Sequence, residues 1–308
     1  MMDVQYLCGV ELGGTKAIAV LARETMIREQ VTLPTRGPDE TLAELSECLR
    51  AWNAVHGIAA LGIASFGPIC VDPSAPGYGR MYRTPKPGWA GVDVFNALTR
   101  GIACPRMIDT DVNGSALAEY RWGAGAGTSS LCYVTIGTGV GGGLVIGGRP
   151  VHGAMHPEIG HLRLRRSPGD GFAGVCPFHA DCIEGLVSGP ALAVRFDDDP
   201  ALVADGDPRW LPVASDMAEL AGTILLTTSA QRILFGGGVA GSRPALLDAA
   251  RSILLDRYGS YLPYLDKRAA QEIMTLPTLG HQAGPLGAVA LADAALKGRH
   301  TDDCQIAI

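Results

Sequence analysis

Two glycine turns, each between two apolar runs, constrain the fold of this 308-residue chain more than any other feature. The first such segment spans residues 7–21 (LCGVELGGTKAIAVL), and the second spans residues 133–148 (YVTIGTGVGGGLVIGG). Because glycine has no Cβ, backbone N–H groups in such a turn can approach an anion closely. A third glycine cluster, at 236–238, follows the apolar run 232–235 and predicts a strand that turns into a helix. The repeated strand–turn–strand pattern predicts a duplicated fold that holds a nucleotide between its halves.

Two known glycine motifs, the dinucleotide fingerprint and the Walker loop, do not account for the second turn. Residues 137–142 match G-x-G-x-x-G, but a dinucleotide fingerprint requires a helix after the glycines, and residues 144–146 predict another strand. A Walker loop, G-x-x-x-x-G-K-[ST], does not occur in the sequence. A tight hairpin without a ligand would explain one such turn. Three glycine turns in one chain favour phosphate binding.

Length and composition exclude several classes of protein. A chain of 308 residues is long enough for two domains, and 47% hydrophobic with 18% charged residues is typical of a globular protein. The net charge of -6 and the lack of a long basic run argue against a nucleic-acid partner. The N-terminus lacks the pattern of a secretion signal, and no apolar stretch approaches the roughly 18 residues of a membrane span. We therefore expect a cytoplasmic protein with no membrane partner.

Apolar periodicity predicts an α/β fold with mixed sheets, because strands and helices alternate in a similar order twice. Short strands are expected at 60–64 and 106–108, besides those that flank the glycine turns. An irregular stretch is expected from about 149 to 187. Helices are expected at about 40–54, 92–98, 113–122, 188–196, 212–228, 243–258 and 285–298.

Cysteine and histidine residues in the irregular stretch have the spacing of a metal site. Cys176, His179 and Cys182 form the pattern C-x2-H-x2-C, and His161 lies fifteen residues upstream. Thiolate and imidazole ligands at this spacing can close a tetrahedral zinc site, which with four protein ligands would be structural. A Cys176–Cys182 disulfide is the first alternative, and a reducing compartment argues against it. The second alternative, that these side chains merely pack, is disfavoured by the polar surroundings of His179.

Asp111 is the candidate catalytic carboxylate. Transfer of a phosphoryl group to an alcohol needs a carboxylate near the hydroxyl, donors around the phosphates and a divalent cation. Asp111 follows a predicted strand, and ligands of open α/β sheets bind beyond the carboxyl ends of strands. The alternative is that Asp111 only caps the helix that begins at Asn113.

Several segments together resemble the ROK sugar kinases (repressors, open reading frames and kinases) of the actin-like ATPase superfamily, and the resemblance covers nearly the whole chain. They are GVELGGTK at 9–16, IDTDVN at 108–113, IGTGVGGG at 136–143, HPEIGH at 156–161 and CIEGLVSGPA at 182–191. Some features resemble the bacterial fructokinase branch of the family. These are Glu11 where many members have Asp, the segments 65–68 and 84–89, and a Cys-His-Cys metal triplet in place of three cysteines.

The resemblance implies an architecture and an activity. The implied fold is α/β, with two actin-like (ribonuclease H-like) domains whose mixed sheets flank a cleft for nucleotide and sugar. The first domain would span 1–113 and recover the helix 285–298, and the second would span 114–284 with a zinc-bound loop at about 156–184. The implied activity is ATP- and Mg²⁺-dependent phosphorylation of a hexose, D-fructose to fructose 6-phosphate, by a homodimer with structural Zn²⁺.

The resemblance also implies roles for individual residues. Asp111 would take the proton from the sugar hydroxyl as it attacks the γ-phosphate of ATP. Glu11 would bind magnesium, and His161 would use one ring nitrogen for zinc and the other for the sugar. The implied sugar-binding residues are Gly67, Pro68, Asp111, Glu158, His161 and Glu184. The residues implied to bind ATP or its phosphates are Gly13, Gly14, Thr15, Lys16, Thr138, Gly139, Pro190, Gly236, Gly237 and Gly238.

One departure from the family pattern leaves the sugar open. Thr110 stands where many ROK glucokinases have Asn, and a hydroxyl offers fewer hydrogen bonds than an amide. This puts glucose specificity in doubt but not the reaction type. Kinases for glucose, mannose or an amino sugar are the alternatives within the class. The alternative from another class is a non-catalytic sugar-sensing protein. Regulators of the family carry an added N-terminal helix-turn-helix domain, and the first strand is expected at about residue 4, which leaves no room for one.

Overall fold

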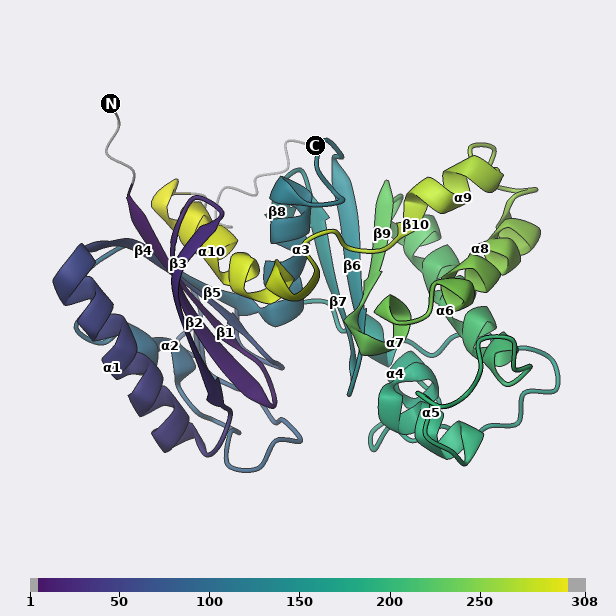
Figure 1. Cartoon of the computed structure of the whole chain (residues 1–308), viewed down its shortest axis with the longest axis horizontal. Helices are drawn as coiled ribbons and strands as arrows, with labels where there is room; N and C mark the ends of the chain where they lie inside the picture. The colour runs from purple at the N-terminus through teal and green to yellow at the C-terminus, as the bar shows by residue number, and fades with distance from the viewer. Residues whose placement is uncertain (1–4, 299–308) are drawn as a thin grey trace. The chain divides into compact units, whose positions relative to one another are not determined.

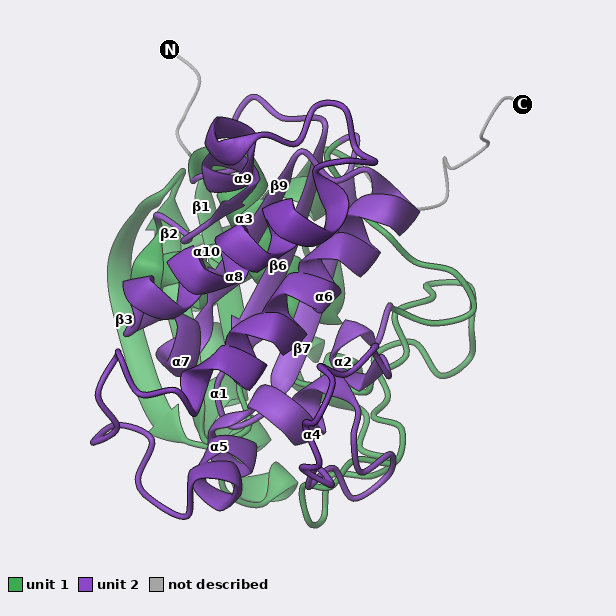
Figure 2. Cartoon of the chain, turned by 90° about the vertical axis from the view of Figure 1, so that its right-hand side faces the viewer, with its two compact units in different colours: residues 1–123, 148–156, 279–308 green, residues 124–147, 157–278 purple. Residues whose placement is uncertain are grey.

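The computed structural model describes residues 5–298 (Figure 1). The chain divides into two compact units, each built from separate segments (Figure 2). Of the described residues, unit 1 comprises 5–123, 148–156 and 279–298, and unit 2 comprises 124–147 and 157–278.

Unit 1 contains a mixed sheet with the strand order β3-β2-β1-β4-β5. A short turn joins β1 to β2 as an antiparallel hairpin, whereas the parallel pair β1 and β4 needs a longer connection, which contains β2, β3 and a helix. Strand β5 is parallel to β4. The strands are β1 (Tyr6–Leu12), β2 (Lys16–Arg23), β3 (Met26–Pro34), β4 (Ile58–Ser65) and β5 (Arg106–Thr110).

Helices cover both faces of this sheet, so its central strands are apolar on both sides (Figure 1). Cys8 and Val10 of β1 pack in one core with α1, whereas Leu7 packs with Val289 of α10 in the other. The helices of unit 1 are α1 (Pro38–His56), α2 (Val94–Thr99), α3 (Asp111–Trp122), η2 (Gly280–Gln282) and α10 (Ala283–Leu296); the two-residue strand β8 (Arg149–Pro150) also belongs to this unit.

Paired glycines let α10 pack directly on the backbone of the sheet. Gly9 of β1 lies beside Gly62 of β4. A Cβ at Gly62 would lie 2.0 Å from the carbonyl oxygen of Ala288, and one at Gly9 would lie 2.9 Å from the Cβ of that alanine. A larger side chain at either glycine would push the helix away.

Unit 2 repeats the plan of unit 1. In its sheet the order runs β10-β9-β6-β7, with β6 and β7 antiparallel and β6, β9 and β10 parallel. These strands are β6 (Ser130–Ile136), β7 (Val140–Ile146), β9 (Arg232–Gly236) and β10 (Met274–Thr275). The helices are η1 (Ile159–His161), α4 (Ile183–Val187), α5 (Gly189–Phe196), α6 (Trp210–Thr228), α7 (Gly237–Gly241), α8 (Pro244–Tyr258) and α9 (Lys267–Ile273). The predicted α/β fold with two mixed sheets is confirmed.

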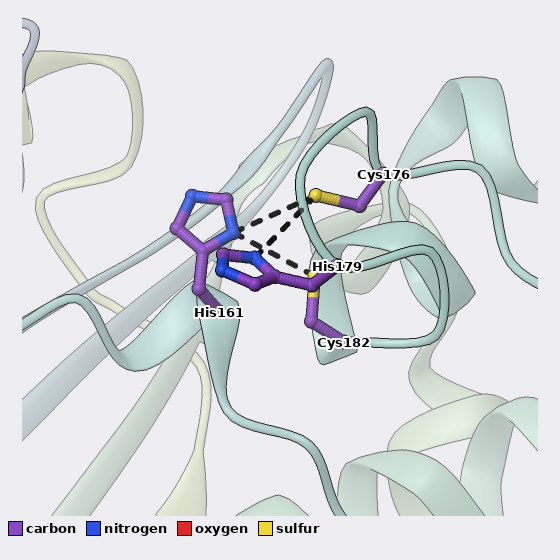
Figure 3. Close-up of side chains that lie close together, drawn as sticks. All are labelled: His161, Cys176, His179 and Cys182. Carbon is purple, nitrogen blue, oxygen red and sulfur yellow. Dashed lines mark hydrogen bonds between the residues drawn. The ribbon is translucent and has the colours of Figure 1, made fainter. Parts of the chain in front are cut away.

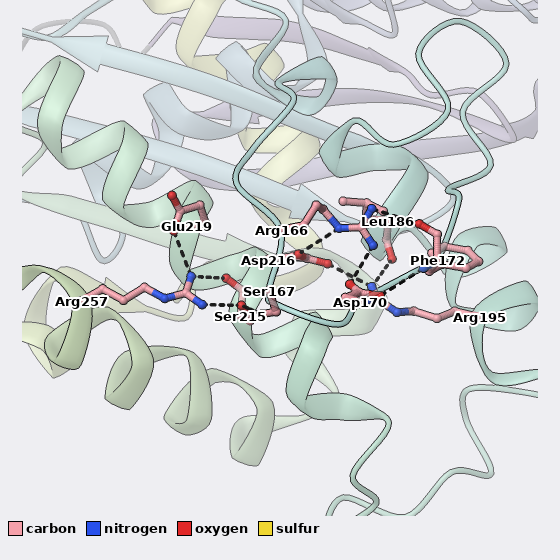
Figure 4. A network of polar contacts seen from close by, with 10 residues as sticks. All are labelled: Arg166, Ser167, Asp170, Phe172, Leu186, Arg195, Ser215, Asp216, Glu219 and Arg257. Carbon is pink, nitrogen blue, oxygen red and sulfur yellow. Dashed lines mark hydrogen bonds and ion pairs between the residues drawn. The ribbon is translucent and has the colours of Figure 1, made fainter.

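Buried ion pairs hold the irregular stretch before α4 (Figure 4). The Asp170 carboxylate pairs with Arg166 at 2.7 Å and with Arg195 of α5, which also pairs with Asp216 of α6 at 3.0 Å. Burial alone would raise the pKa of Asp170, but hydrogen bonds and the two arginine charges lower it overall. Because buried charges without partners are costly, this network ties the stretch to α5 and α6.

The boundary between the units differs from the predicted one at residue 113. Helix α3 belongs to unit 1, which continues to Gly123, because α3 packs against α10 through Gly114 and Gly287. The segment 148–156 also belongs to unit 1, whereas the sequence predicts it in the second domain.

The sequence did not predict strand β3 or helices α4 and α9. β3 was missed because most of its side chains are polar or exposed, and the two helices because they are short. None of the helices within residues 5–298 has the length and apolar character of a transmembrane span.

Candidate active site and metal centre

In unit 1, three predicted site segments lie at one edge of the sheet. Leu12 of β1 lies beside Ser65 of β4, which lies beside Thr110 of β5, and these strands are parallel. The first glycine turn follows β1, the segment 67–68 follows β4, and Asp111 follows β5. The fold therefore brings these segments together at the carboxyl ends of three strands, where ligands bind in open α/β sheets.

Asp111 is the first residue of α3, but it is not the capping residue. The N-cap is Thr110, whose Oγ1 accepts a hydrogen bond of 3.2 Å from the backbone N–H of Asn113. The Asp111 carboxylate accepts from the N–H of Val112 at 2.9 Å and is partly exposed. The hypothesis that Asp111 only caps this helix is therefore disfavoured, since Thr110 meets that need.

The sequence did not predict the buried cluster that lies next to Asp111 at the start of α3. Asp109 is 1% exposed, and its carboxylate accepts from the Asn113 amide at 2.8 Å and contacts His152 Nε2 at 2.9 Å. Burial lowers the pKa of His152, but the hydrogen bond and charge of Asp109 outweigh it and raise the pKa overall. The cluster fixes the first turn of α3 and hence the position of Asp111.

The segment after β4 is held by a second histidine. His156 is buried, and its Nε2 accepts from the backbone N–H of Ile69 at 3.3 Å. A Cβ at Gly67 would lie 3.5 Å from the same imidazole ring. The Gly67–Pro68 peptide bond is cis. His156 thus packs directly against the predicted sugar-binding segment.

Glu11 precedes the first glycine turn. Burial raises the pKa of its carboxyl group, and the charge of Lys16 offsets part of this increase. A Cβ at Gly284, in the first turn of α10, would lie 2.2 Å from a Glu11 carboxylate oxygen. Glycine at this position leaves the room that the carboxylate occupies.

The predicted nucleotide residues of unit 2 lie at the corresponding edge of its sheet. The second glycine turn follows β6 and the third cluster follows β9, which is parallel to β6. The N–H of Gly189, at the start of α5, donates to the carbonyl oxygen of Gly137 at 2.7 Å, which places Pro190 next to the turn. Gly237 has a positive φ of 81°, and a Cβ there would lie 2.3 Å from the carbonyl oxygen of Ile136.

Two glutamates of unit 2 lie close to this turn. Glu184 Oε2 accepts from the N–H of Val140 at 3.1 Å, and a Cβ at Gly139 would lie 2.7 Å from the same oxygen. Burial, together with the charge of Glu184, raises the pKa of Glu158 to about 6. The two carboxylates are therefore near enough to influence each other. Glu158 is the N-cap of η1, and His161 is the last residue of that helix.

The four predicted metal ligands converge on one point (Figure 3). Their ligand atoms all lie within 4.8 Å of one another. His161 Nδ1 lies 3.6 Å from Cys182 Sγ and 3.8 Å from Cys176 Sγ, which lies 3.8 Å from His179 Nδ1. Separations near 3.5 Å are expected about a tetrahedral zinc with Zn–S about 2.3 Å and Zn–N about 2.0 Å. Both cysteines are free thiols, not the disulfide considered as an alternative.

This fold is shared with the ROK sugar kinases, an actin-like ATPase fold. The ROK hexokinase from Thermus thermophilus matches with a TM-score of 0.76 at 27% identity, covering 96% of this chain and 100% of that chain. A model of the ROK family matches residues 7–295. The chain belongs to the ROK family, as the sequence predicted.

Curated relatives of similar length carry the name fructokinase. The fructokinase of Zymomonas mobilis is 41% identical over 94% of this chain and 97% of its own length. That of Streptococcus mutans is 35% identical over 92% of this chain and 96% of its own length. A glucokinase of Streptomyces coelicolor is 28% identical over 92% of this chain and 96% of its own length.

Proposed function

We propose that this protein is a fructokinase, which transfers the γ-phosphoryl group of ATP to D-fructose and yields fructose 6-phosphate. The observation that carries the proposal is the edge of the unit 1 sheet, where a glycine turn and a partly exposed carboxylate follow parallel strands. The fructokinases at 41% and 35% identity support fructose over glucose.

Asp111 is proposed as the general base that accepts the proton of the attacking hydroxyl. Thr110 and the Asp109 cluster hold the helix turn on which Asp111 lies, so the carboxylate is oriented before substrate binds. Such a positioned base contributes about 10²- to 10⁴-fold to the rate. Gly67, Pro68, Glu158, His161 and Glu184 are proposed to bind the sugar.

The glycine turns are proposed to bind the phosphates of ATP through backbone N–H groups. The residues proposed for ATP in unit 1 are Gly13, Gly14, Thr15 and Lys16, and those in unit 2 are Thr138, Gly139, Pro190, Gly236, Gly237 and Gly238. Mg²⁺, when bound, neutralises charge on the phosphate oxygens. Glu11 suits this ion, because Mg²⁺ in nucleotide sites is held by one or two carboxylates and the phosphates.

The cysteine and histidine cluster is proposed as a structural zinc site. Two sulfur and two nitrogen donors with tetrahedral spacing favour Zn²⁺, and a site closed by four protein ligands suits a structural role. The Nδ1 atom of His161 faces both sulfur atoms, so its Nε2 is left for the sugar. Burial raises the pKa of the Cys182 thiol to about 11, so metal binding has to displace a proton.

The proposal is tested by ADP release from Mg-ATP with fructose, glucose, mannose and N-acetylated hexoses, against a control without sugar. We expect release with fructose to exceed that with every other sugar. A clear preference for glucose, mannose or an amino sugar would assign another ROK kinase activity. Release with none of them would favour a non-catalytic sugar-binding protein. The resemblance also implies a homodimer, which light scattering of the purified protein would test.

A further inference from the structure

A lysine from a distant loop binds the first glycine turn. Lys86 Nζ donates to the carbonyl oxygen of Gly14 at 2.6 Å and to that of Thr35 at 3.1 Å. The loop is fixed nearby by the buried Trp89, whose indole N–H donates to the carbonyl oxygen of Arg36 at 3.1 Å. The ammonium group is therefore held against the turn by a rigid part of unit 1.

All four carbonyl groups of the turn have donors from unit 1. The Gly13 carbonyl accepts from Thr35 Oγ1 at 2.7 Å, and the Gly14 carbonyl accepts from Lys86. The Thr15 carbonyl accepts from the N–H of Thr35 at 2.9 Å, and the Lys16 carbonyl accepts from the N–H of Gly13 at 3.0 Å. The orientation of each peptide group in the turn is thereby set.

The free N–H groups point away from these donors. In a trans peptide the C=O and the following N–H point in opposite directions. Binding of the Gly13 and Gly14 carbonyls therefore turns the N–H groups of Gly14 and Thr15 to the other side. Within residues 5–298 neither N–H has an acceptor, and a Cβ at Gly14 would meet no atom within 4 Å. The two donors are therefore unpaired in the described chain, and there is open space beside Gly14 at the edge where the candidate site lies.

We propose that Lys86 is a positioning residue for ATP, which holds the Gly14–Thr15 peptide so that the Thr15 N–H donates to a phosphate oxygen. The inference rests on the proposed phosphotransferase function. Glycine places few limits on backbone rotation, so without the lysine this peptide is free to turn its carbonyl towards the phosphate. The positive charge at the carbonyl end also polarises the peptide and strengthens its N–H as a donor.

Lys86→Met tests the inference, since it keeps the length and apolar stem of the side chain but removes the donors. Steady-state kinetics are measured with ATP and fructose varied separately, and binding of the β,γ-imido analogue of ATP is measured by calorimetry. We expect kcat/KM for ATP and affinity for the analogue to fall about tenfold or more, with KM for fructose changed less than twofold. Lys86→Arg, which retains donors and charge, should recover part of the loss.

Arg83→Met is the matched control, because Arg83 is an exposed cation of the same loop and makes no hydrogen bond or ion pair within the described chain. It should leave both kinetic constants within twofold of the wild type. Unchanged ATP binding in Lys86→Met, equal losses for ATP and fructose, or an equal effect of Arg83→Met would each overturn the inference. Thermal unfolding of every variant shows whether a loss of ATP binding or activity is caused by misfolding. If Lys86→Met is misfolded, the kinetics of Lys86→Arg decide whether the inference holds. A wild type that neither binds the analogue nor releases ADP would instead overturn the proposed function.

Discussion

The two glycine turns follow the same strand–turn–strand plan but are supported differently. In unit 1 two carbonyls of the turn, those of Gly13 and Gly14, accept from the side chains of Thr35 and Lys86, which are distant in sequence. In unit 2 the turn is closed by the N–H of Gly137 on the Gly139 carbonyl, at 2.9 Å, and by the N–H of Gly189 on the Gly137 carbonyl. A duplicated fold has therefore kept the turn while changing what orients it, with both side chains and backbone in unit 1 and mainly backbone in unit 2.

The two sheet edges also differ in chemistry. The edge in unit 1 carries Asp111 and the Asp109 cluster that supports it, whereas the edge in unit 2 carries two glutamates, with the cysteine and histidine cluster nearby in the chain. In the proposed mechanism proton transfer belongs to unit 1, whereas the carboxylates proposed to recognise sugar hydroxyls, Glu158 and Glu184, belong to unit 2. Substitutions at the two edges should therefore alter different kinetic constants.

The largest effect is expected from Asp111→Asn, which removes the proposed base but keeps the shape of the side chain. We expect kcat to fall about 10²- to 10⁴-fold with a much smaller change in fructose affinity, because proton transfer contributes on that scale. Rapid-quench measurement of product and calorimetric titration of fructose check the two quantities. Asp39→Asn, an exposed carboxylate in the first turn of α1, is the control. A variant that turned over at the rate of the wild type would eliminate Asp111 as the base.

The next largest effect is expected from Cys182→Ser in unit 2, on zinc content, stability and KM for fructose. Elemental analysis of the wild type should give about one zinc ion per chain, and the variant should have lost most of it. Loss of the metal should lower the unfolding temperature and raise KM for fructose, because His161 and the loop before α4 lose their anchor. Cys48→Ser, the same change at a partly buried thiol outside the cluster, should keep its zinc. Metal-free wild type with full activity would show that the cluster is not a zinc site.

An intermediate effect is expected from Gly139→Ala in the second turn. Its Cβ would lie 2.7 Å from Glu184 Oε2, so the carboxylate has to move. We expect kcat/KM for fructose to fall about tenfold, on the scale of one lost hydrogen bond to a charged group, and kcat/KM for ATP to fall as well, because Gly139 is also proposed to bind the phosphates. Gly137→Ala is the matched control, because a Cβ there meets nothing within 4 Å. Equal kinetics for the two variants would remove Glu184 from sugar recognition.

The smallest effect is expected at His152, on stability. His152→Leu leaves the buried Asp109 without one partner and should lower the free energy of unfolding by about 1–3 kcal/mol. The folded-state pKa of His152 is raised, so its protonated form stabilises the native state fully below the unfolded pKa of about 6.5, and this contribution is lost as pH rises through the folded pKa. His152→Gln keeps a donor but does not titrate. Denaturant unfolding from pH 5 to 8 should show the wild type losing its advantage over His152→Gln as pH rises, and parallel curves would contradict this pairing.

Local patterns predicted the parts of the fold that depend on neighbouring residues. The glycine turns, the strand before Asp111 and the spacing of Cys176, His179 and Cys182 each lie within a short segment. The structure contains these turns and this strand, and it brings the two cysteines together with His161 and His179. Strand β3 was not predictable from alternation, because its sequence MIREQVTLP is largely exposed and gains its structure from pairing with β2.

Contacts between distant segments could not be predicted from one sequence. Lys86 and Thr35 meet Gly14 and Gly13 only after the sheet and its loops have folded, and nothing near Lys86 in the sequence indicates its partner. The same holds for His152, which lies in an irregular stretch and contacts Asp109 from 43 positions away. The boundary of unit 1 was misplaced for a similar reason, since α3 is assigned by its packing on α10.

The most direct test of the central claim is the identity of the product formed from fructose and Mg-ATP. Phosphorus and carbon NMR of the reaction mixture distinguish phosphorylation at the 6-position from phosphorylation at the 1-position. We predict fructose 6-phosphate as the product, formed in equal amount with ADP. Fructose 1-phosphate, or ADP formed without any phosphorylated fructose, would contradict the assignment.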